Sequence, residues 1–509
     1  MNLTAHLPVL LVVVPLLAAP LTVLLRRRSV AFALVLGASW LTLALAIALH
    51  LQVQAHGVVS YAIGNWAPPW GIEYRVDRLS SYVLILICAI ASVVLPYSRA
   101  SIEAEIEPQQ HYLFYTMFAL CLTGLLGMTV TGDAFNIFVF LEISSLATYV
   151  MVALAADRRA LLAAYQYLIM GTIGATFVVI GVGLLYLMTG TLNLADMAER
   201  LVPLRGTRPV LAALAFLTVG LSIKAAVFPL HQWLPNAYAY APSAVAAFVA
   251  ATATKVALYV LMRYYFTVFG ETQVLARLPM QQMLLVLALA GMFGASTVAI
   301  FQTDLKRLFA YSSVAQVGYI ILGLSFGSAT GLAAGIVHLF NHAVTKGAIF
   351  MLLGAVTAAL GGAGLARIQG LGRTMPWASL GVVICGLSLI GVPGTAGFIS
   401  KWVLVQAALE RGQWWLVFMI VGSSLLAIVY VWRFVEAAYF GTAPADAPPI
   451  QRIRWQLLAP SAVLGGAGLA RIQGLGRTMP WASFGVVICG LSLIGVPGTA
   501  GFISKWVLV

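Results

Sequence analysis

The stretch IGVPGTAGFISKW, residues 390–402, puts a proline–glycine break and a lysine into one long apolar segment. Pro393 removes a backbone hydrogen bond from any helix it interrupts, and Gly394 adds backbone freedom next to it. Lys401 follows the break by eight residues and sits among apolar neighbours. A positive charge among apolar residues is unfavourable, so Lys401 is expected to have a structural or functional role.

The composition is that of a membrane protein. Of the 509 residues 62% are hydrophobic and only 8% are charged, whereas a soluble domain has about 25% charged residues. Runs of about 20 apolar residues can cross a bilayer. The sequence therefore predicts an all-α integral membrane protein of about 14 transmembrane helices, the last of them within 480–509. The other thirteen expected spans are 5–25, 30–50, 79–97, 112–131, 134–154, 160–188, 209–229, 243–267, 280–301, 308–326, 330–358, 376–404 and 414–440.

Basic residues predict the orientation of these spans. The first run lacks a basic start, so we expect a span and not a cleaved signal peptide. Arg26, Arg27 and Arg28 follow it, which places the amino terminus outside by the positive-inside rule. Loops that carry Arg158, Arg159, Lys306, Arg307, Arg367, Arg373, Arg452 and Arg454 then also fall inside. The net charge of +13 is interpreted as topology, because no nucleic-acid-binding motif accompanies it.

Residues 361–405 are repeated at 465–509 with one difference, Leu380 against Phe484. Ancient repeats diverge much further than this. We interpret the second copy as a recent duplication or an assembly error, and we do not expect Lys505 to form a second working site. The four cysteines lie in apolar runs and are interpreted as small core residues. No nucleotide loop, haem motif or metal-type cysteine spacing is present, so the sequence predicts no cofactor and no metal.

Lysine is used selectively. The chain has 22 arginines and six lysines, and all lysines except Lys306 fall inside expected spans, namely Lys224, Lys255, Lys346, Lys401 and Lys505. A charge at bilayer depth costs at least about 2.5–3.5 kcal/mol on insertion scales. A buried lysine can release its proton near neutral pH, whereas arginine stays charged. The choice of lysine therefore indicates proton transfer.

Other ionisable residues in the spans fit this interpretation. Glu142 is an acid well inside one span, and His338, His342 and Lys346 recur every four residues, so they share one helix face. Two histidines at this spacing could bind zinc, but no glutamate follows the first one as in HExxH and no third ligand is evident. Polar packing between helices, or a static ion pair of Glu142 with a lysine, remain alternatives to a proton relay.

A second break mirrors the first. In LSIKAAVFPLHQWLP, residues 221–235, Pro229 comes five residues after Lys224, whereas Pro393 comes before Lys401. The two spans are expected to run in opposite directions. Reversed order in opposed spans is what an inverted repeat produces, although each proline alone could be a simple kink.

Long motifs resemble one family. The segments KAAVFPLHQWLPNAYAYAPSAVAAFVAATATKVALYVLMR (224–263), DLKRLFAYSSVAQVGYI (304–320), HLFNHAVTKGAIFM (338–351) and GVPGTAGFISKW (391–402) resemble the proton-conducting antiporter-type subunits of complex I, membrane hydrogenases and Mrp cation/proton antiporters. Residues 135–177 look most like the MrpD branch, which is related to the M and N subunits of complex I. The resemblance covers roughly 75–460.

The resemblance implies fourteen spans with two inverted five-helix repeats and a polar axis at the membrane midplane. Expected regions are 1–110 for amino-terminal spans, 111–267 and 280–440 for the repeats, and 456–509 for the final span. It implies that Glu142 pairs with Lys224, that Lys255 and His338 are relay residues, and that Lys401 ends the axis. His342 and Lys346 lie in the same motif. The M branch has glutamate in place of Lys401.

Three hypotheses about function follow. The first is the proton-translocating subunit of a multisubunit sodium/proton antiporter in a bacterial inner membrane, with other membrane subunits as partners and with no redox site of its own. The second is a proton-pumping subunit of an NADH:quinone oxidoreductase or a membrane hydrogenase. The third is a membrane scaffold without transport.

Overall fold

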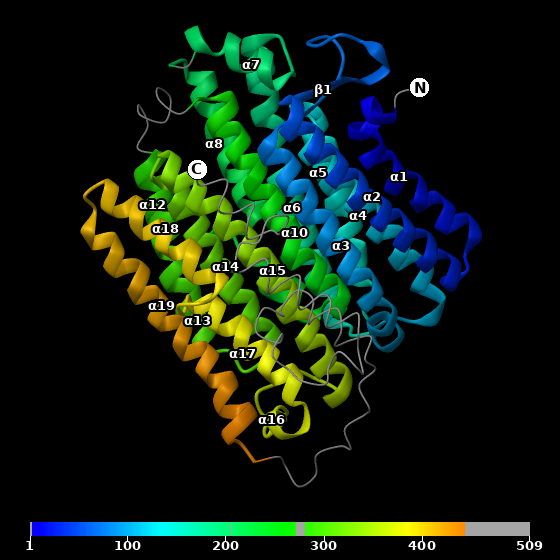
Figure 1. Ribbon diagram of the computed structural model, residues 1–509, viewed down its shortest axis with the longest axis vertical. Helices are drawn as coiled ribbons and strands as arrows, with labels where there is room; N and C mark the ends of the chain where they lie inside the picture. The colour runs from blue at the N-terminus through cyan, green and yellow to red at the C-terminus, as the bar shows by residue number, and fades with distance from the viewer. Residues whose placement is uncertain (1–2, 205, 271–279, 443–509) are drawn as a thin grey trace.

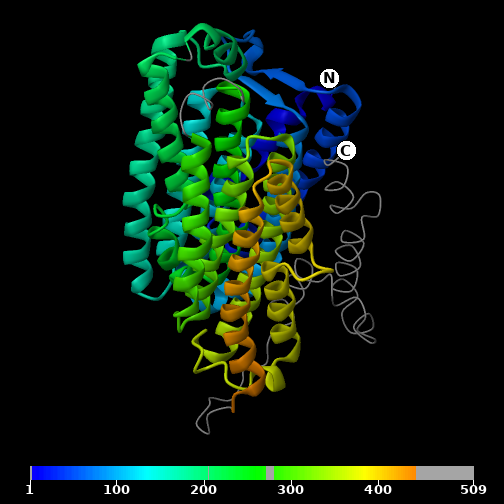
Figure 2. The ribbon, with the colours of Figure 1, turned by 90° about the vertical axis from the view of Figure 1, so that its left-hand side faces the viewer.

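The computed structural model describes residues 3–204, 206–270 and 280–442, and these form a bundle of helices that run side by side (Figure 1; Figure 2). Twelve helical segments in the described part are long and apolar enough to cross a membrane. Two shorter helices, Pro376–Ile390 and Ala396–Glu410, occupy the expected span 376–404. The predicted all-helical membrane fold is confirmed. The expected span in 480–509, Lys505 and the whole second copy of the repeat lie outside the described residues.

The α-helices are α1 (Leu7–Leu25), α2 (Arg28–His56), α3 (Arg78–Glu105), α4 (His111–Val130), α5 (Ala134–Ala153), α6 (Arg159–Thr189), α7 (Leu194–Arg200), α8 (Arg208–Ala225), α9 (Trp233–Tyr240), α10 (Ser243–Met262), α12 (Met280–Ala290), α13 (Ser296–Ile300), α14 (Leu305–Ser325), α15 (Ala329–Leu360), α16 (Leu371–Thr374), α17 (Pro376–Ile390), α18 (Ala396–Glu410) and α19 (Trp414–Val435). Turns of π-helix extend or join some of them at Arg263–Val268, Gly291–Ala295 and Glu436–Phe440. A hairpin of β1 (Val59–Ala62) and β2 (Glu73–Val76) pairs Val59 with Val76 and Ala62 with Glu73.

Both expected helix breaks are present. α8 ends at Ala225, Ala226 takes a left-handed conformation (φ 56°), and α9 resumes at Trp233. The crossing thus continues to Tyr240, beyond the expected end at 229, because helix returns after Pro229. The second crossing is α17, then Gly391 and Gly394 with positive φ, then α18. Glycine accepts these two left-handed positions without the steric cost that a Cβ would bring.

Contacts between loops show which loops lie together at each end of the bundle. Arg28 pairs with Glu103, the Ala156 amide donates to the Glu105 carbonyl, and the Arg159 guanidinium lies 4.8 Å from the ring centre of Tyr240. The loops after α1, α3, α5 and α9 therefore meet at one end, called here the basic end. The β-hairpin and α7 lie at the opposite end, where Tyr74 bridges to Thr131 (Figure 1). Arg28 and Arg159 thus lie at the same end, as the expected alternation requires, whereas the side of the membrane that this end faces stays a prediction.

The two halves repeat one local arrangement at opposite ends. Asp133 caps α5, and it forms a bridge to Asn193 in the loop that follows the long helix α6. Asp304 caps α14, and it forms a bridge to Gly364 in the loop that follows the long helix α15. The first bridge lies at the hairpin end and the second at the basic end. An inverted repeat predicts such a pair, whereas the repeat boundaries themselves stay a prediction.

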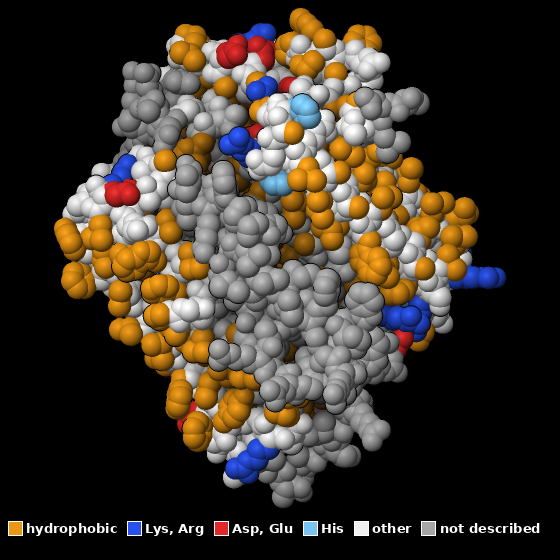
Figure 3. All heavy atoms as spheres, viewed as in Figure 1, with side chains coloured by type: hydrophobic (Ala, Val, Ile, Leu, Met, Phe, Trp, Pro, Cys, Tyr) orange, Lys and Arg blue, Asp and Glu red, His pale blue; other side chains and the backbone are white. Residues whose placement is uncertain are grey.

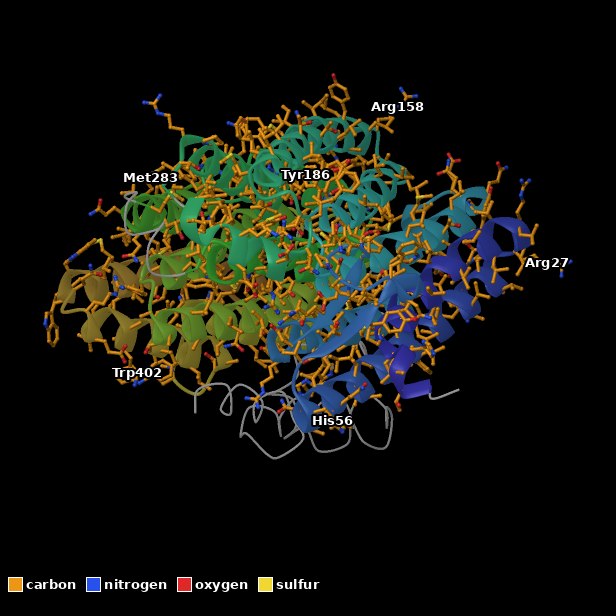
Figure 4. All side chains as sticks on the ribbon, turned by 90° about the horizontal axis from the view of Figure 1, so that it is seen from above. Arg27, His56, Arg158, Tyr186, Met283 and Trp402 are labelled. Carbon is orange, nitrogen blue, oxygen red and sulfur yellow. The ribbon has the colours of Figure 1, made fainter. Side chains whose placement is uncertain are left out.

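The outside of the bundle is apolar where lipid would touch it. Figure 3 shows that hydrophobic side chains make up most of the described surface on one face, with charged groups gathered in a few places. Exposed large apolar residues recur along α6 and α19, among them Leu162, Ile173, Phe418 and Leu425. Seen from above, Arg27 and Arg158 point outward from the rim (Figure 4). The buried polar side chains, in contrast, lie inside the bundle.

Candidate functional site

Lys224 in the last turn of α8 reaches three oxygens on α5. Its Nζ lies 3.2 Å from Glu142 Oε1, 2.7 Å from Ser145 Oγ and 3.3 Å from the Tyr149 hydroxyl. The Lys224 side chain is 7% exposed and that of Glu142 is 25% exposed. The expected pairing of Glu142 with Lys224 is therefore present. The partly exposed carboxylate lies closer to the bundle surface than the amine does.

Local sequence holds this pair in place. A Cβ at Gly171 of α6 would lie 1.7 Å from the Tyr149 hydroxyl, so only glycine lets that hydroxyl reach Lys224. The Tyr149 ring packs edge-on against Tyr167, which stacks on Trp233 with centroids 3.9 Å apart. Trp233 Nε1 donates to the Ile223 carbonyl over 2.9 Å and so joins the start of α9 to the end of α8. The break and the ion pair are thus one packed unit.

Lys255 and Lys346 have only neutral hydrogen-bond partners among the described residues. Lys255 on α10 is 1% exposed and donates to the Ala250 carbonyl and to Thr254 Oγ1, both on its own helix. Lys346 on α15 is fully buried and donates to the Phe309 carbonyl over 2.7 Å and to Ser312 Oγ over 2.8 Å. A buried ammonium without a counter-charge is costly, whereas the neutral amine is not. Both amines are therefore buried without a counter-charge among the described residues.

The two histidines on α15 differ in their surroundings. His338 Nδ1 lies 2.8 Å from Ser400 Oγ and its Nε2 lies 2.9 Å from Gln316 Oε1, so both ring nitrogens are engaged. His342 is 2% exposed, and neither of its ring nitrogens has a hydrogen-bond partner within the described chain. The two rings lie 6.4 Å apart. No third His, Cys, Asp or Glu joins them in the described ranges, and this pair alone is not a zinc site.

The amine of Lys401 on α18 contacts the end of α17, across the break between the two helices. Its Nζ donates to the carbonyls of Leu389 and Ile390, at 2.9 and 3.0 Å, and to Ser424 Oγ at 2.9 Å. These carbonyls belong to the end of α17, where a cation is favoured by the helix dipole. The amine also lies 4.3 Å from the Tyr319 ring centre. Trp402, the next residue, is 53% exposed and points to the rim (Figure 4).

These residues occupy a continuous series of neighbouring helices. α8 packs against α10, α10 against α15, and α15 against α18. Lys224, Lys255, Lys346 and Lys401 therefore follow one another across the bundle, with the histidines on α15 between the last members. Among these four lysines, in the described part of the chain, an ion pair with a carboxylate is found for Lys224 alone. The series is called here the buried axis.

Sequence reasoning missed several of the partners. Ser145 and Tyr149 stand three and seven residues after Glu142, which is helix-face spacing and could have found them. Gln316 is an isolated amide in an apolar span. Lys306 does not lie in a loop before the expected span 308–326, although it does lie at the basic end. α14 begins at Leu305, and Lys306 is only 6% exposed, because its amine turns inward to other helix ends.

The arrangement supports proton exchange better than ion binding. The buried axis offers four amines and two imidazoles with hydroxyl, amide and carbonyl partners. Only one carboxylate, Glu142, contacts it among the described ion pairs. Buried amines of this kind can take up and release protons near neutral pH. A cation site would need several oxygen ligands around one point.

Comparison with known proteins gives the family. The profile of the family described as NADH:quinone oxidoreductase/Mrp antiporter, transmembrane, matches residues 131–427. The chain belongs to this family. It is 42% identical over 487 residues to the N subunit of the NADH-quinone oxidoreductase of Desulforudis audaxviator, covering 91% of this chain and 95% of the relative. It is 30% identical to the D-type subunit of the Na(+)/H(+) antiporter of Alkalihalophilus pseudofirmus, covering 78% and 80%.

A solved structure agrees with the fold of this antiporter-type subunit. A chain of the Mrp complex from Dietzia sp. superimposes with a TM-score of 0.83 at 26% identity, covering 100% of both chains. The protein is therefore a multi-pass membrane protein and an antiporter-like subunit of the kind found in Mrp or complex I-type assemblies. The resemblance seen in the motifs is confirmed. The comparisons do not separate the two types of assembly.

Proposed function

We propose that the chain is the proton-translocating subunit of a multisubunit cation/proton antiporter, and that protons move along the buried axis. The axis would run from Glu142 and Lys224 through Lys255, His342, Lys346 and His338 to Lys401. The observation that carries the proposal is that four buried lysines occupy neighbouring helices while only one has a carboxylate partner among the described residues. In a protein whose buried lysines had only a structural role, each charge would be expected to have a partner, because a buried charge without one is costly.

The contacts of Lys224 suggest how proton transfer would begin. Glu142 stabilises the charged amine of Lys224 at 3.2 Å. If the carboxylate withdraws, Lys224 keeps only Ser145 and Tyr149, which are neutral, and its charged form loses its main support. The proton then moves toward Lys255 on the adjoining helix. Because Glu142 is partly exposed at the edge of α5, a neighbouring subunit can act on it directly.

The far end of the axis has the chemistry to receive the proton. Lys401 already holds three oxygen acceptors, and the Tyr319 hydroxyl shares Ser424 with it. His338 joins this end through Ser400, the residue before Lys401. The exchanged cation in this proposal is sodium, on the strength of the name of the relative from Alkalihalophilus pseudofirmus.

The test is transport by the assembled complex in liposomes. Purified complex carrying Glu142→Ala or Lys224→Ala is reconstituted beside wild type, and proton movement is followed with an internal pH dye after a sodium pulse. We expect both variants to assemble and to lose most sodium-dependent proton flux. Potassium and lithium pulses identify the cation. Unchanged flux in both variants would favour a scaffold without transport.

A second candidate function rests on one observation, the 42% identity to the N subunit of an NADH-quinone oxidoreductase. The same buried axis would then serve a redox-driven pump. Affinity purification of the tagged chain from native membranes distinguishes the two. Co-purification of flavin- and iron–sulfur-containing subunits favours the oxidoreductase, and co-purification of small membrane subunits alone favours the antiporter.

A further inference from the structure

A second polar cluster lies at the basic end, away from the buried axis. Glu105 is the last residue of α3, Ser243 is the first residue of α10, and Lys306 is the second residue of α14. Lys306 Nζ lies 3.0 Å from Ser243 Oγ, which lies 2.6 Å from Glu105 Oε1. The three helix ends thus place one hydroxyl between an amine and a carboxylate.

The carboxylate is held firmly in this cluster. Glu105 Oε2 accepts from the Ser243 amide and from Ser101 Oγ at 2.9 Å, while the Ala244 amide donates to Ser101 Oγ at 3.2 Å. Glu105 therefore satisfies the Ser243 amide and Ser101 the Ala244 amide, both at the amino terminus of α10, where a negative charge is favoured. Lys306 is 6% exposed, so its charge is largely removed from water. Lys306 and Ser243 are thus buried and Glu105 is half-buried, and Ser243 joins the two charged groups.

A buried hydroxyl beside the cluster has no evident structural task. Tyr97 is fully buried, and its hydroxyl makes no hydrogen bond of ordinary geometry with a described residue, although Ser101 and Ser243 lie near it. A Cβ at Gly354 of α15 would lie 2.0 Å from that hydroxyl and 2.4 Å from Ser243 Cβ. The Tyr97 hydroxyl therefore lies against Ser101 and Ser243 of the cluster, in space that Gly354 leaves open.

α14 connects this cluster to the buried axis. Lys306 is the second residue of the helix, and Phe309 and Ser312 further along it accept the hydrogen bonds of Lys346. Six residues of helix span about 9 Å, so Ser312 lies roughly that far from Lys306 along the helix axis. Lys346 is in turn close enough for its charge to act on His342, as is that of Lys255. α14 therefore links the cluster at the basic end to Lys346 in the middle of the axis.

We propose that Glu105, Ser243 and Lys306 form a proton-transfer site that exchanges protons between the basic end and the buried axis at Lys346. This rests on the proposed function, because it needs an axis that carries protons. In the transfer step a Lys306 N–H bond breaks as the proton joins Ser243 Oγ, and the original Ser243 O–H bond breaks as its proton joins Glu105. The ammonium and carboxylate become a neutral amine and a carboxylic acid, and the reverse step restores them.

The charged neighbours have other partners. Arg28 pairs with Glu103, Arg159 pairs with Asp157, and Asp304 accepts the Arg307 amide at the start of α14. On the adjoining loop, His111 Nε2 lies 3.0 Å from the Ile106 carbonyl. None of these contacts links Lys306 to Glu105. The two residues are linked through Ser243, which contacts both. Ser243 is therefore the group whose loss should interrupt the path without removing either charge.

Three variants of the whole complex test the proposal. Lys306→Arg keeps the charge and a donor toward Ser243 but cannot release a proton, Glu105→Gln removes the acid, and Ser243→Ala removes the bridging hydroxyl. Proton flux per assembled complex in liposomes is measured over a range of pH on the basic-end side. We expect each variant to lose at least about a hundredfold in flux, the lower end of the range for loss of a proton-transfer group, and Glu105→Gln to flatten the pH profile.

Glu103→Gln is the matched control, because it removes an ion pair from the same end of α3 but lies outside the cluster. It should retain the flux and pH profile of wild type. If Lys306→Arg assembles and transports normally with an unchanged pH profile, the proposed site is wrong, whatever the effect of the other variants on assembly. If Glu142→Ala and Lys224→Ala also transport normally, the proposed function itself fails, which is a separate outcome.

Discussion

The amine of Lys401 lies 2.9 Å from the carbonyl oxygen of Leu389, across the break between α17 and α18. The lysine thus caps the helix whose interruption exposed that carbonyl. This contact gives Lys401 a structural task in addition to any part in proton movement. Variants must therefore distinguish the helix-capping role of Lys401 from its proposed role in proton transfer.

Lys401→Met should lose both roles. The Leu389 and Ile390 carbonyls and Ser424 would lose their buried donor, and each unsatisfied group costs about 1–3 kcal/mol. Lys401→Arg keeps donors and charge but cannot release a proton. We expect a lower melting temperature only for the methionine variant and loss of transport for both. Trp402→Phe, a change at the exposed neighbour, should alter neither. Full transport by Lys401→Arg would reduce Lys401 to a cap.

Gly171 sets the position of Tyr149, so Gly171→Ala should disturb the Lys224 site from another helix. The new Cβ would meet the Tyr149 hydroxyl at 1.7 Å, and overpacking of this kind costs about 1–3 kcal/mol. With Tyr149 displaced, Lys224 loses a neutral partner, and we expect a several-fold loss of transport per assembled complex. Transport in liposomes and thermal unfolding are measured together.

Gly183→Ala on the same helix is the control. A Cβ there meets nothing within 4 Å, and alanine improves helix propensity by about 1 kcal/mol over glycine. This variant should transport normally and be at least as stable as wild type. Equal behaviour of the two alanine variants would mean that the position of Tyr149 does not matter to Lys224.

The sequence predicted the elements that follow from composition and from proline. The spans, the two breaks and the pairing of Glu142 with Lys224 depend on local pattern or on long motifs, and the structure has them. The Lys306 cluster was not predictable in this way. Glu105, Ser243 and Lys306 stand at three helix ends far apart in the chain, and basic residues at helix ends are usually topology signals. Only tertiary packing shows that Lys306 turns inward.

The acidic cap of α3 gives a prediction about pH. Burial disfavours the charge of Asp77, but the hydrogen bond and charge of Arg263 and the Ser80 amide outweigh it and hold the Asp77 pKa below its ordinary value. A lowered folded-state pKa means that this carboxylate stabilises the fold above its unfolded-state pKa. That contribution disappears as the pH falls through the folded-state value.

Asp77→Asn keeps a capping side chain but removes the charge, and it should lower stability by up to about 1 kcal/mol at neutral pH, since the pair is partly exposed. Tryptophan fluorescence during heating in detergent, at a series of pH values, measures the difference from wild type. The difference should begin to shrink below about pH 4, the ordinary pKa of an aspartate, and should vanish only when the pH is below the lowered folded-state pKa. Asp157→Asn, in a more exposed pair, should show almost none. A difference that grows in acid contradicts this account.

His338 and His342 distinguish a relay from polar packing, because only one of them holds hydrogen bonds within the described chain. His338→Leu leaves Gln316 Oε1 without its partner and should destabilise the complex by about 1–3 kcal/mol. His342→Leu removes a ring whose nitrogens bond to no described residue, so it should cost little stability. If protons pass through His342 between Lys255 and Lys346, the stable leucine variant will nonetheless lose most of its transport. Normal transport by His342→Leu, measured per assembled complex in liposomes, would assign that ring to packing and leave the relay to the lysines.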